Sequence, residues 1–220
     1  MLINEIFKSI SGESVNAGYP TIFIRTFGCN LKCTYCDSLY AVEGNDYKQM
    51  TPNEILQECE KLGVKRIIFT GGEPLVQKDA PQLVDLLCDN GYFVEIETNG
   101  AVNLQKFHDK LQTKRKDNLM YTMDYKTFSS GALEKMIKSN LEFLGTCDVI
   151  KFVVGSTEDL ELMENVLNNN DIKAIPFVSP IFGDIEPKEI VKYLLDKNLT
   201  QCRFQLQIHK FVWDVNKRGV

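Results

Sequence analysis

Short apolar runs rich in β-branched residues alternate with amphipathic segments along most of the 220-residue chain. A period of two residues indicates a strand and a period of about 3.6 residues indicates a helix. The pattern predicts strands at Thr21–Phe27, Arg66–Thr70, Phe93–Glu97, Leu119–Asp124, Val149–Val153, Lys173–Phe177 and Arg203–Ile208. It predicts helices at Pro52–Leu62, Ala80–Asn90, Leu104–Lys110, Leu133–Ser139, Thr157–Asn168 and Pro187–Asn198.

Local signals support several of these helix boundaries. Thr51 before Pro52 combines an N-capping side chain with a residue that suits the first helical turn. Gly63 and Gly91 directly follow two predicted helices, where glycine commonly ends a helix in the left-handed conformation.

The alternation of strands and helices predicts an α/β protein with a largely parallel sheet and right-handed connections. Six or seven such units in 220 residues are fewer than a closed eightfold barrel requires. We therefore expect a partial, open TIM-like β/α barrel of about six parallel strands, formed by one domain over residues 1–220. A doubly wound sheet is the alternative, because periodicity does not separate the two. Both folds place function at the C-terminal ends of the strands.

Composition and net charge argue against some kinds of binding partner, such as nucleic acids and membranes. Apolar residues make up 44% of the chain and charged residues 25%, as in ordinary globular proteins. The net charge of −5 argues against a nucleic-acid binder that relies on bulk electrostatics. No signal-peptide pattern is visible, and no run reaches the roughly 18 apolar residues that a membrane span needs. We expect a cytoplasmic protein with a small-molecule substrate and no membrane or nucleic-acid partner.

Three of the seven cysteines, Cys29, Cys33 and Cys36, lie within eight residues in the loop after the first predicted strand of the barrel. Three thiolates at this spacing can ligate three irons of a [4Fe-4S] cluster and leave the fourth iron without a protein ligand. Because an open iron can bind and reduce an external molecule, the spacing indicates catalysis. Structural zinc is the alternative, but it usually takes four ligands in paired spacing and no second pair is present. We expect the remaining cysteines to be small buried hydrophobic residues: Cys59, Cys88, Cys147 and Cys202.

Other polar motifs follow the next predicted strands. The glycine pair in Thr70-Gly71-Gly72-Glu73-Pro74 would let the backbone approach a ligand closely. The alternative is a strand-to-helix turn that binds no ligand, since such a turn also uses glycine. The polar residues of Glu97-Thr98-Asn99-Gly100 end a buried strand and need partners, with a capped turn as the alternative. Asp124-Tyr125-Lys126 is similar but less specific, since Lys126 could be a surface lysine.

The cysteine triplet, with Tyr35 before its last member, resembles the signature of the radical S-adenosylmethionine (SAM) enzymes. The resemblance implies that SAM chelates the open iron through its methionyl group. It also implies that an external flavodoxin-like or ferredoxin-like protein reduces the cluster and that one electron from the cluster then cleaves SAM. The resulting 5′-deoxyadenosyl radical would abstract hydrogen from the substrate. The resemblance further implies cofactor contacts at Tyr35, Gly71, Gly72, Glu73, Thr98, Asn99, Asp124 and Lys126.

Further segments resemble one family within this superfamily, the 7-carboxy-7-deazaguanine synthases. They are the N-terminal run from Glu5 through Gly12-Glu13-Ser14 to Arg25, then Cys36-Asp37-Ser38, and the late Gln205 to Trp213 segment, so the resemblance covers nearly the whole chain. The family converts 6-carboxy-5,6,7,8-tetrahydropterin into 7-carboxy-7-deazaguanine and ammonia by ring contraction, for 7-deazapurine and queuosine biosynthesis. The resemblance also implies a magnesium ion and a homodimer.

The resemblance assigns roles to six further residues. It implies that Arg25 binds the substrate carboxylate, for which a planar guanidinium is suited. Glu13 and Glu97 would contact the pterin ring, and His209, with Gln207, would close the pocket. Ser38 would hold magnesium, a cation that prefers oxygen ligands.

The chain also departs from the family pattern. Ser11 stands where a glutamine is usual, Ser14 where a glycine is frequent, and Asp124-Tyr125 where some members have Ser-Pro. Two other functions stay open at this stage. One is an activase that places a glycyl radical on a partner enzyme, and the other is a non-catalytic iron–sulfur or zinc protein.

Overall fold

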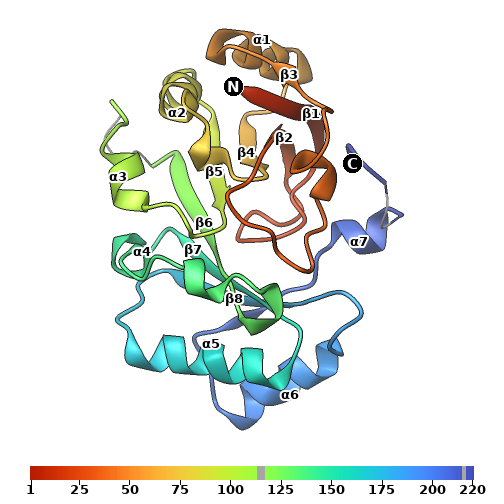
Figure 1. The fold of residues 1–220 in the computed structure, drawn as a ribbon, viewed down its shortest axis with the longest axis vertical. Coiled ribbons are helices and arrows are strands. Elements are labelled where there is room, and N and C mark those ends of the chain that lie inside the picture. The colour runs from red at the N-terminus through yellow and green to blue at the C-terminus, as the bar shows by residue number, and fades with distance from the viewer. Residues whose placement is uncertain (113–116, 215–216) are drawn as a thin grey trace.

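The computed structural model describes residues 1–112, 117–214 and 217–220. In these residues nine strands form one sheet in the order β3-β1-β2-β4-β5-β6-β7-β8-β9 (Figure 1). The strands are β1 (Leu2–Ile10), β2 (Pro20–Thr26), β3 (Lys48–Gln49), β4 (Arg66–Gly71), β5 (Phe93–Thr98), β6 (Leu119–Tyr125), β7 (Val149–Val154), β8 (Ile175–Pro180) and β9 (Arg203–Phe204).

From β2 onward, each strand lies parallel to the next barrel strand in chain order. Right-handed connections in an order that never reverses place the covering helices on one face of the sheet. The doubly wound alternative is therefore wrong, because it requires a reversal of the strand order. The sheet begins at β3 and ends at β9 without closing, so the expected open, partial barrel is confirmed.

Helices surround the outer face of the curved sheet (Figure 1). Helix α1 starts in a capping box, in which the Thr51 side chain accepts from the Glu54 N–H and Glu54 accepts from the Thr51 N–H. None of the helices in the described residues is long and apolar enough to cross a membrane. The α-helices are α1 (Pro52–Leu62), α2 (Ala80–Asp89), α3 (Leu104–His108), α4 (Asn140–Phe143), α5 (Thr157–Asn169), α6 (Pro187–Asp196) and α7 (His209–Val212); single 3₁₀ turns are η1 (Leu39–Ala41), η2 (Pro74–Val76), η3 (Phe128–Ser130) and η4 (Leu133–Lys135).

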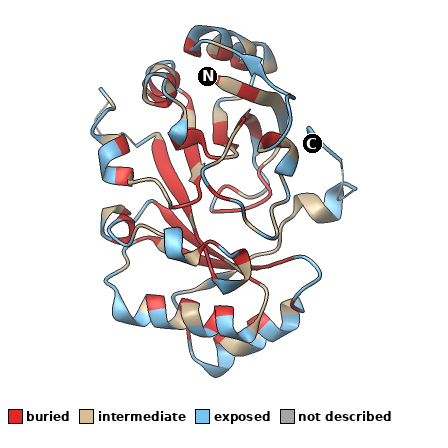
Figure 2. Ribbon diagram, in the orientation of Figure 1, coloured by how far each residue is buried: buried red, intermediate tan, exposed pale blue. Residues whose placement is uncertain are grey.

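Alternate residues of each strand face opposite sides of the sheet. Ile67 and Phe69 of β4 belong to the hydrophobic core, whereas Ile68 and Thr70 line a cavity inside the curve of the sheet. Figure 2 shows that the central strands are buried, whereas the outer faces of the helices are exposed. The main core thus lies between the sheet and the helices. The inner face of the sheet carries the residues that line the cavity and a smaller apolar cluster of Met120, Val149 and Phe177.

The sequence pattern missed β1, which pairs antiparallel with β2. The register shifts between Ile3 and Glu5, and this irregularity breaks the alternation by which a strand is recognised. The predicted helix Leu133–Ser139 is also wrong, since the segment forms η4 and then a separate α4. Asn140 determines that break, because its side chain bonds the backbone of Leu104, Gly100 and Val102.

Two late strands also differ from prediction. Pairing of β8 with β7 starts at Ile175, so the strand lies later than the predicted Lys173–Phe177. The predicted Arg203–Ile208 strand shortens to β9, because the next residue, Gln205, turns to bond the N-terminal loop. Among the scattered cysteines, Cys59 and Cys88 are buried as expected, whereas Cys202 is half-buried and Cys147 is exposed.

Candidate active site

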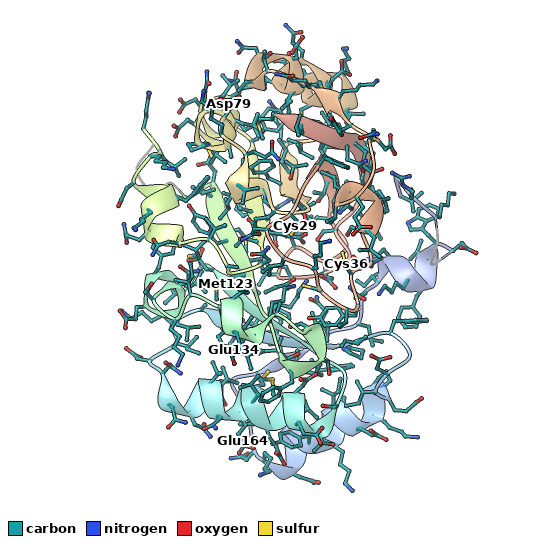
Figure 3. The ribbon with its side chains drawn as sticks, in the orientation of Figure 1. Cys29, Cys36, Asp79, Met123, Glu134 and Glu164 are labelled. Atoms are coloured by element: carbon teal, nitrogen blue, oxygen red, sulfur yellow. The ribbon has the colours of Figure 1, made fainter. Side chains whose placement is uncertain are left out.

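A cavity of about 490 Å³ opens at the C-terminal ends of the parallel strands. Its wall combines the cysteine loop after β2, the ends of β4 to β7 and the segment around α7. Cys29 and Cys36 lie near the centre of the molecule on this loop (Figure 3). The polar motifs that the sequence placed at separate strand ends therefore meet in one cavity.

Cys29, Cys33 and Cys36 are partly exposed free thiols that line the cavity. Burial raises the pKa of the Cys33 and Cys36 thiols, and the charge of Lys126 opposes the rise at both. In the described part of the chain, no three Cys, His, Asp or Glu side chains converge on a point that would hold one metal ion. Three thiols at this spacing can each bind a different iron of a cluster.

The glycine pair after β4 lets this turn pack against the cysteine loop. A Cβ on Gly72 would lie 2.1 Å from the carbonyl oxygen of Gly28, and one on Gly71 would lie 2.3 Å from the nitrogen of Thr26. The Gly72 N–H donates to Thr26 O over 3.1 Å, and the Glu73 N–H donates to Gly28 O over 2.9 Å. The space that the glycines leave is thus filled by the backbone of the chain itself, while both residues still line the cavity.

Glu73 is fully buried and joins the ends of β4 and β5. Its carboxylate accepts from the Leu75 N–H at 3.1 Å, the Thr98 hydroxyl at 2.9 Å and the Asn99 N–H at 2.8 Å. Burial raises the pKa of Glu73 to about 7, although these donors oppose it. Among the described residues, Glu73 does not line the cavity, whereas Thr98 and Asn99 do. The carboxylate therefore fixes the residues that face the cavity.

Asn99 connects the end of β5 to the cysteine loop. Its side-chain amide donates to Cys29 Sγ over 3.5 Å and to Asn30 Oδ1 over 2.8 Å. On the loop, the Tyr35 hydroxyl is buried and has no hydrogen-bond partner in the described part of the chain. Because an unsatisfied buried hydroxyl costs free energy, its place in the cavity wall indicates contact with a bound group.

A chain of alternating charges crosses the inner face of the sheet. Lys126 Nζ lies 2.9 Å from Asp124 Oδ2, and Lys151 Nζ lies 3.1 Å from Asp124 Oδ1 and 2.5 Å from Glu13 Oε2. Burial opposes the charge on Asp124, but Lys126 and Lys151 lower its pKa to about 2. Burial likewise opposes the charge on both lysines, yet the carboxylates raise their pKa. Lys126 is only 7% exposed and is not a surface lysine.

Two carboxyl groups in the cavity are suited to ligand contact. Glu13 has one buried oxygen, Oε1, without a hydrogen-bond partner among the described residues. Burial raises the pKa of Glu97 to about 7, while Lys151 opposes the rise and Glu95 adds to it. A carboxyl group with a pKa near 7 can donate or accept a proton at neutral pH.

Arg25 lies on β2 beside the cysteine loop. Its Nε donates to Glu5 Oε1 over 2.8 Å, and the Tyr40 hydroxyl donates to the same oxygen over 3.1 Å. Within the described residues, the two terminal guanidinium nitrogens form no hydrogen bond. Glu5 therefore holds the guanidinium by one edge, and Arg25 lines the cavity.

Ser38 and Asp37 follow the last cluster cysteine, and both line the cavity. The Ser38 hydroxyl donates to Asp37 Oδ1 over 2.9 Å. Burial opposes the charge of Asp37, but this hydrogen bond and the charges of Lys210 and Arg25 lower its pKa. An ionised carboxylate and a hydroxyl thus stand side by side.

His209 begins helix α7, directly after the segment Arg203–Ile208 that the sequence predicted as a strand. A Cβ on Gly12 would lie 2.2 Å from His209 Nδ1, so Gly12 makes room for the ring. Burial lowers the pKa of His209, although the charges of Glu13 and Asp37 oppose the fall. His209 and Gln207 both line the cavity, as the prediction of a closing element requires.

The departures from the family pattern have structural explanations. Ser14 has a φ of +67°, a conformation that glycine adopts at lower cost. Gln205 bonds both the N–H and the carbonyl of Ser14, and the Ser14 hydroxyl lies 3.2 Å from that of Thr122. The Ser11 hydroxyl donates to the Glu13 carbonyl over 2.9 Å, so it shapes the loop that carries Glu13.

Sequence reasoning missed Lys151. The signal was present, since a lysine interrupts the apolar run Val149–Val154 that predicts a buried strand. It also missed Asp37 as an individual site residue and Gln205 as the support of the N-terminal loop.

The radical SAM superfamily profile matches residues 23–151 of the chain. The sequence is 43% identical to a 7-carboxy-7-deazaguanine synthase of Clostridium acetobutylicum, over 98% of this chain and 97% of that protein. It is 40% identical to one of Methanospirillum hungatei, over 96% of this chain and 85% of that protein. A solved structure, "Crystal structure of QueE from Escherichia coli", has the same fold, with a TM-score of 0.74, 24% identity and 94% coverage of both chains.

A more distant structure, "Crystal structure of Streptococcus suis SuiB bound to S-adenosylmethionine", has a TM-score of 0.58 at 18% identity and covers 82% of this chain and 48% of that one. The superfamily implies a [4Fe-4S] cluster and SAM, and the free thiols and the unpartnered Tyr35 hydroxyl fit these groups. Because the profile covers more than half of the chain and the relatives align with nearly all of it, the protein belongs to the 7-carboxy-7-deazaguanine synthase family of radical SAM enzymes.

Proposed function

We propose that this protein catalyses the radical ring contraction of 6-carboxy-5,6,7,8-tetrahydropterin to 7-carboxy-7-deazaguanine and ammonia. The names of its relatives support this activity. The observation that carries it is the combination, in one cavity, of three free thiols, an anchored guanidinium and a buried carboxylate oxygen without a partner among the described residues. A carboxylated heterocycle with N–H donors complements the last two groups.

The cysteine side of the cavity would hold the cofactors. Cys29, Cys33 and Cys36 would ligate three irons, and when bound the reduced cluster and SAM supply a carbon radical that abstracts hydrogen. Most residues to which the family resemblance assigns cofactor contacts line the cavity: Tyr35, Gly71, Gly72, Thr98, Asn99, Asp124 and Lys126. Glu73 would act indirectly, through its hydrogen bonds to Thr98 and Asn99.

The opposite side of the cavity would bind the pterin. Arg25 pairs with the substrate carboxylate through its terminal nitrogens, because Glu5 occupies only Nε. Glu13 accepts a ring N–H at Oε1. Glu97, with a pKa of about 7, holds the proton that departing ammonia needs. His209 and Gln207 cover the ring from the α7 side and limit the entry of water.

Magnesium would bind at Ser38 and Asp37. A carboxylate that stays ionised and a neighbouring hydroxyl are the hard oxygen donors that this cation prefers, and water completes its coordination. Ser38→Ala should therefore raise the magnesium concentration needed for half-maximal activity. An unchanged magnesium titration would remove Ser38 from the site.

Three further features of the proposal follow from family resemblance. Residues 1–220 form a single catalytic domain, the enzyme is a cytoplasmic homodimer, and a flavodoxin-like or ferredoxin-like protein delivers the electron. Gel filtration of the purified protein tests the dimer independently of activity.

The deciding experiment is anaerobic reconstitution, followed by addition of SAM, reductant, magnesium and the carboxylated tetrahydropterin. We expect 5′-deoxyadenosine and a deazapurine of the product mass. Without 5′-deoxyadenosine, the radical function is wrong. If SAM is cleaved but no deazapurine forms, the glycyl-radical activase becomes the better hypothesis.

A further inference from the structure

Lys151 is a charged residue in the middle of a buried strand. Its neighbours in β7 are apolar, and the side chain is 9% exposed. A buried ammonium persists only where anions offset its loss of hydration. Lys151 meets this condition through Glu13 and Asp124, at 2.5 and 3.1 Å.

The anions around Lys151 come from separate elements of the fold. Glu13 lies on the loop between β1 and β2, Asp124 on β6 and Glu97 on β5, and all three raise the pKa of Lys151 against the effect of burial. His209 of α7 also faces Glu13. Without the ammonium, the carboxylates on this side of the cavity would repel one another, and the Glu13 side chain would lose the contact that holds it.

The contact with Lys151 decides which part of Glu13 is available. Oε2 is bound to the ammonium, whereas Oε1 is buried and without a partner among the described residues. Because Glu13 lines the cavity, Oε1 is the oxygen left for a ligand. The lysine therefore controls the orientation of the group that would meet the substrate.

We propose that Lys151 is a positioning residue for substrate binding, which holds the Glu13 carboxylate by Oε2 and directs its free oxygen, Oε1, to the N–H edge of a bound heterocycle. This inference rests on the proposed function, since it assigns the substrate side of the same cavity. Lys126 provides a comparison within the chain. It is a second buried lysine that pairs with Asp124, but it lies on the cofactor side, 5.9 Å from the centre of the Tyr35 ring.

The test is equilibrium binding of the carboxylated tetrahydropterin to the reconstituted enzyme without reductant, which prevents turnover. Lys151→Met should weaken binding by about 10- to 100-fold at pH 7, the range expected for a hydrogen bond to a charged group. Under turnover, KM should change more than kcat. Lys151→Arg should restore most of the affinity, because it restores the positive charge.

Two controls separate positioning from packing. Lys126→Met, the matched buried variant, should weaken SAM binding and leave pterin affinity near that of the wild type. In a Glu13→Gln background, Lys151→Met should have little further effect, since the carboxylate that it positions is gone. Should Lys151→Met fail to fold, as judged by circular dichroism, Lys151→Gln gives the same readouts with a polar side chain.

Several results would overturn the proposal. They are unchanged pterin affinity in Lys151→Met, a failure of Lys151→Arg to restore affinity, or the same loss in the Glu13→Gln background. Each leaves the proposed function standing, because the wild-type enzyme still binds and converts the pterin. If the wild type binds no pterin, the proposed function fails and this inference fails with it.

Discussion

Gly72→Ala tests how tightly the turn after β4 holds the cysteine loop. The added methyl group would lie 2.1 Å from the Gly28 oxygen, 2.5 Å from the Gly28 carbonyl carbon and 3.1 Å from Cys29 Cβ. Real contacts of this kind essentially never fall under 3.0 Å, so one backbone must move away from the other. The nearest atoms belong to the main chain, and no side-chain rotation can relieve the overlap.

The structure sets the size of the effect. Overpacking of this kind costs about 1–3 kcal/mol. The hydrogen bond from the Glu73 N–H to Gly28 O, 2.9 Å long, spans the same contact, and its loss adds about 1 kcal/mol. A shift of about 1 Å at Cys29 would also separate its thiol from Asn99, and misplacement by that much can reduce catalysis about 100-fold.

Gly63→Ala is the matched control. Gly63 has a φ of +69° and no atom within 4 Å of the position that an added methyl group would take, so alanine there costs about 1 kcal/mol through backbone conformation alone. Urea unfolding of the cluster-free protein measures both losses, and iron and sulfide content after anaerobic reconstitution measures the cluster. We expect both variants to lose stability and only Gly72→Ala to lose iron. Full iron content and wild-type SAM cleavage in Gly72→Ala would refute the reasoning.

Three other predictions concern single side chains. Arg25→Ala should keep its cluster and raise the KM for the pterin at least about tenfold, since a charge-assisted pair is lost; loss of the cluster would instead make Arg25 structural. Ser14→Gly should leave the free energy of unfolding within about 1 kcal/mol of the wild type, because relief of the left-handed backbone offsets the lost contact with Thr122, whereas Ser14→Ala should destabilise by about 1 kcal/mol; equal effects would contradict this account. Burial raises the pKa of Glu97 from its ordinary 4.5 to about 7, so its contribution to stability is present at low pH and is lost as the pH rises through 7. Glu97→Gln should remove about 1–3 kcal/mol of this pH dependence from urea unfolding of the cluster-free protein between pH 5 and 8, and an unchanged dependence would exclude Glu97 as its source.

Local signals were sufficient for much of the fold. Helix α1 occupies the predicted Pro52–Leu62, because its capping residues and its closing Gly63 are neighbours in the sequence. The cysteine loop also lies where its spacing and the preceding strand placed it. In each case the information is held within a few consecutive residues.

The remaining features depend on contacts between distant residues. The register irregularity in β1 breaks the alternation that would identify the strand from its sequence. The sequence predicts Glu73 as a cofactor ligand, although in the fold its carboxylate accepts hydrogen bonds from Thr98 and Asn99 at the end of the next strand. In the sequence, Lys151 is only a charged residue within an apolar strand. Its role depends on Glu13, which is 138 residues away along the chain and contacts it only in the folded structure. Sequence patterns indicate which residues are unusual, but only the fold shows what faces them.

The two hydrogen bonds between Gln205 and the backbone of Ser14 join residues that are 191 positions apart. Contacts over such separations form late in folding, because a long loop of chain must close first. The loop that carries Glu13 is therefore synthesised well before Gln205, the residue that fixes it in place. A newly made chain can complete most of its sheet before it has a substrate pocket.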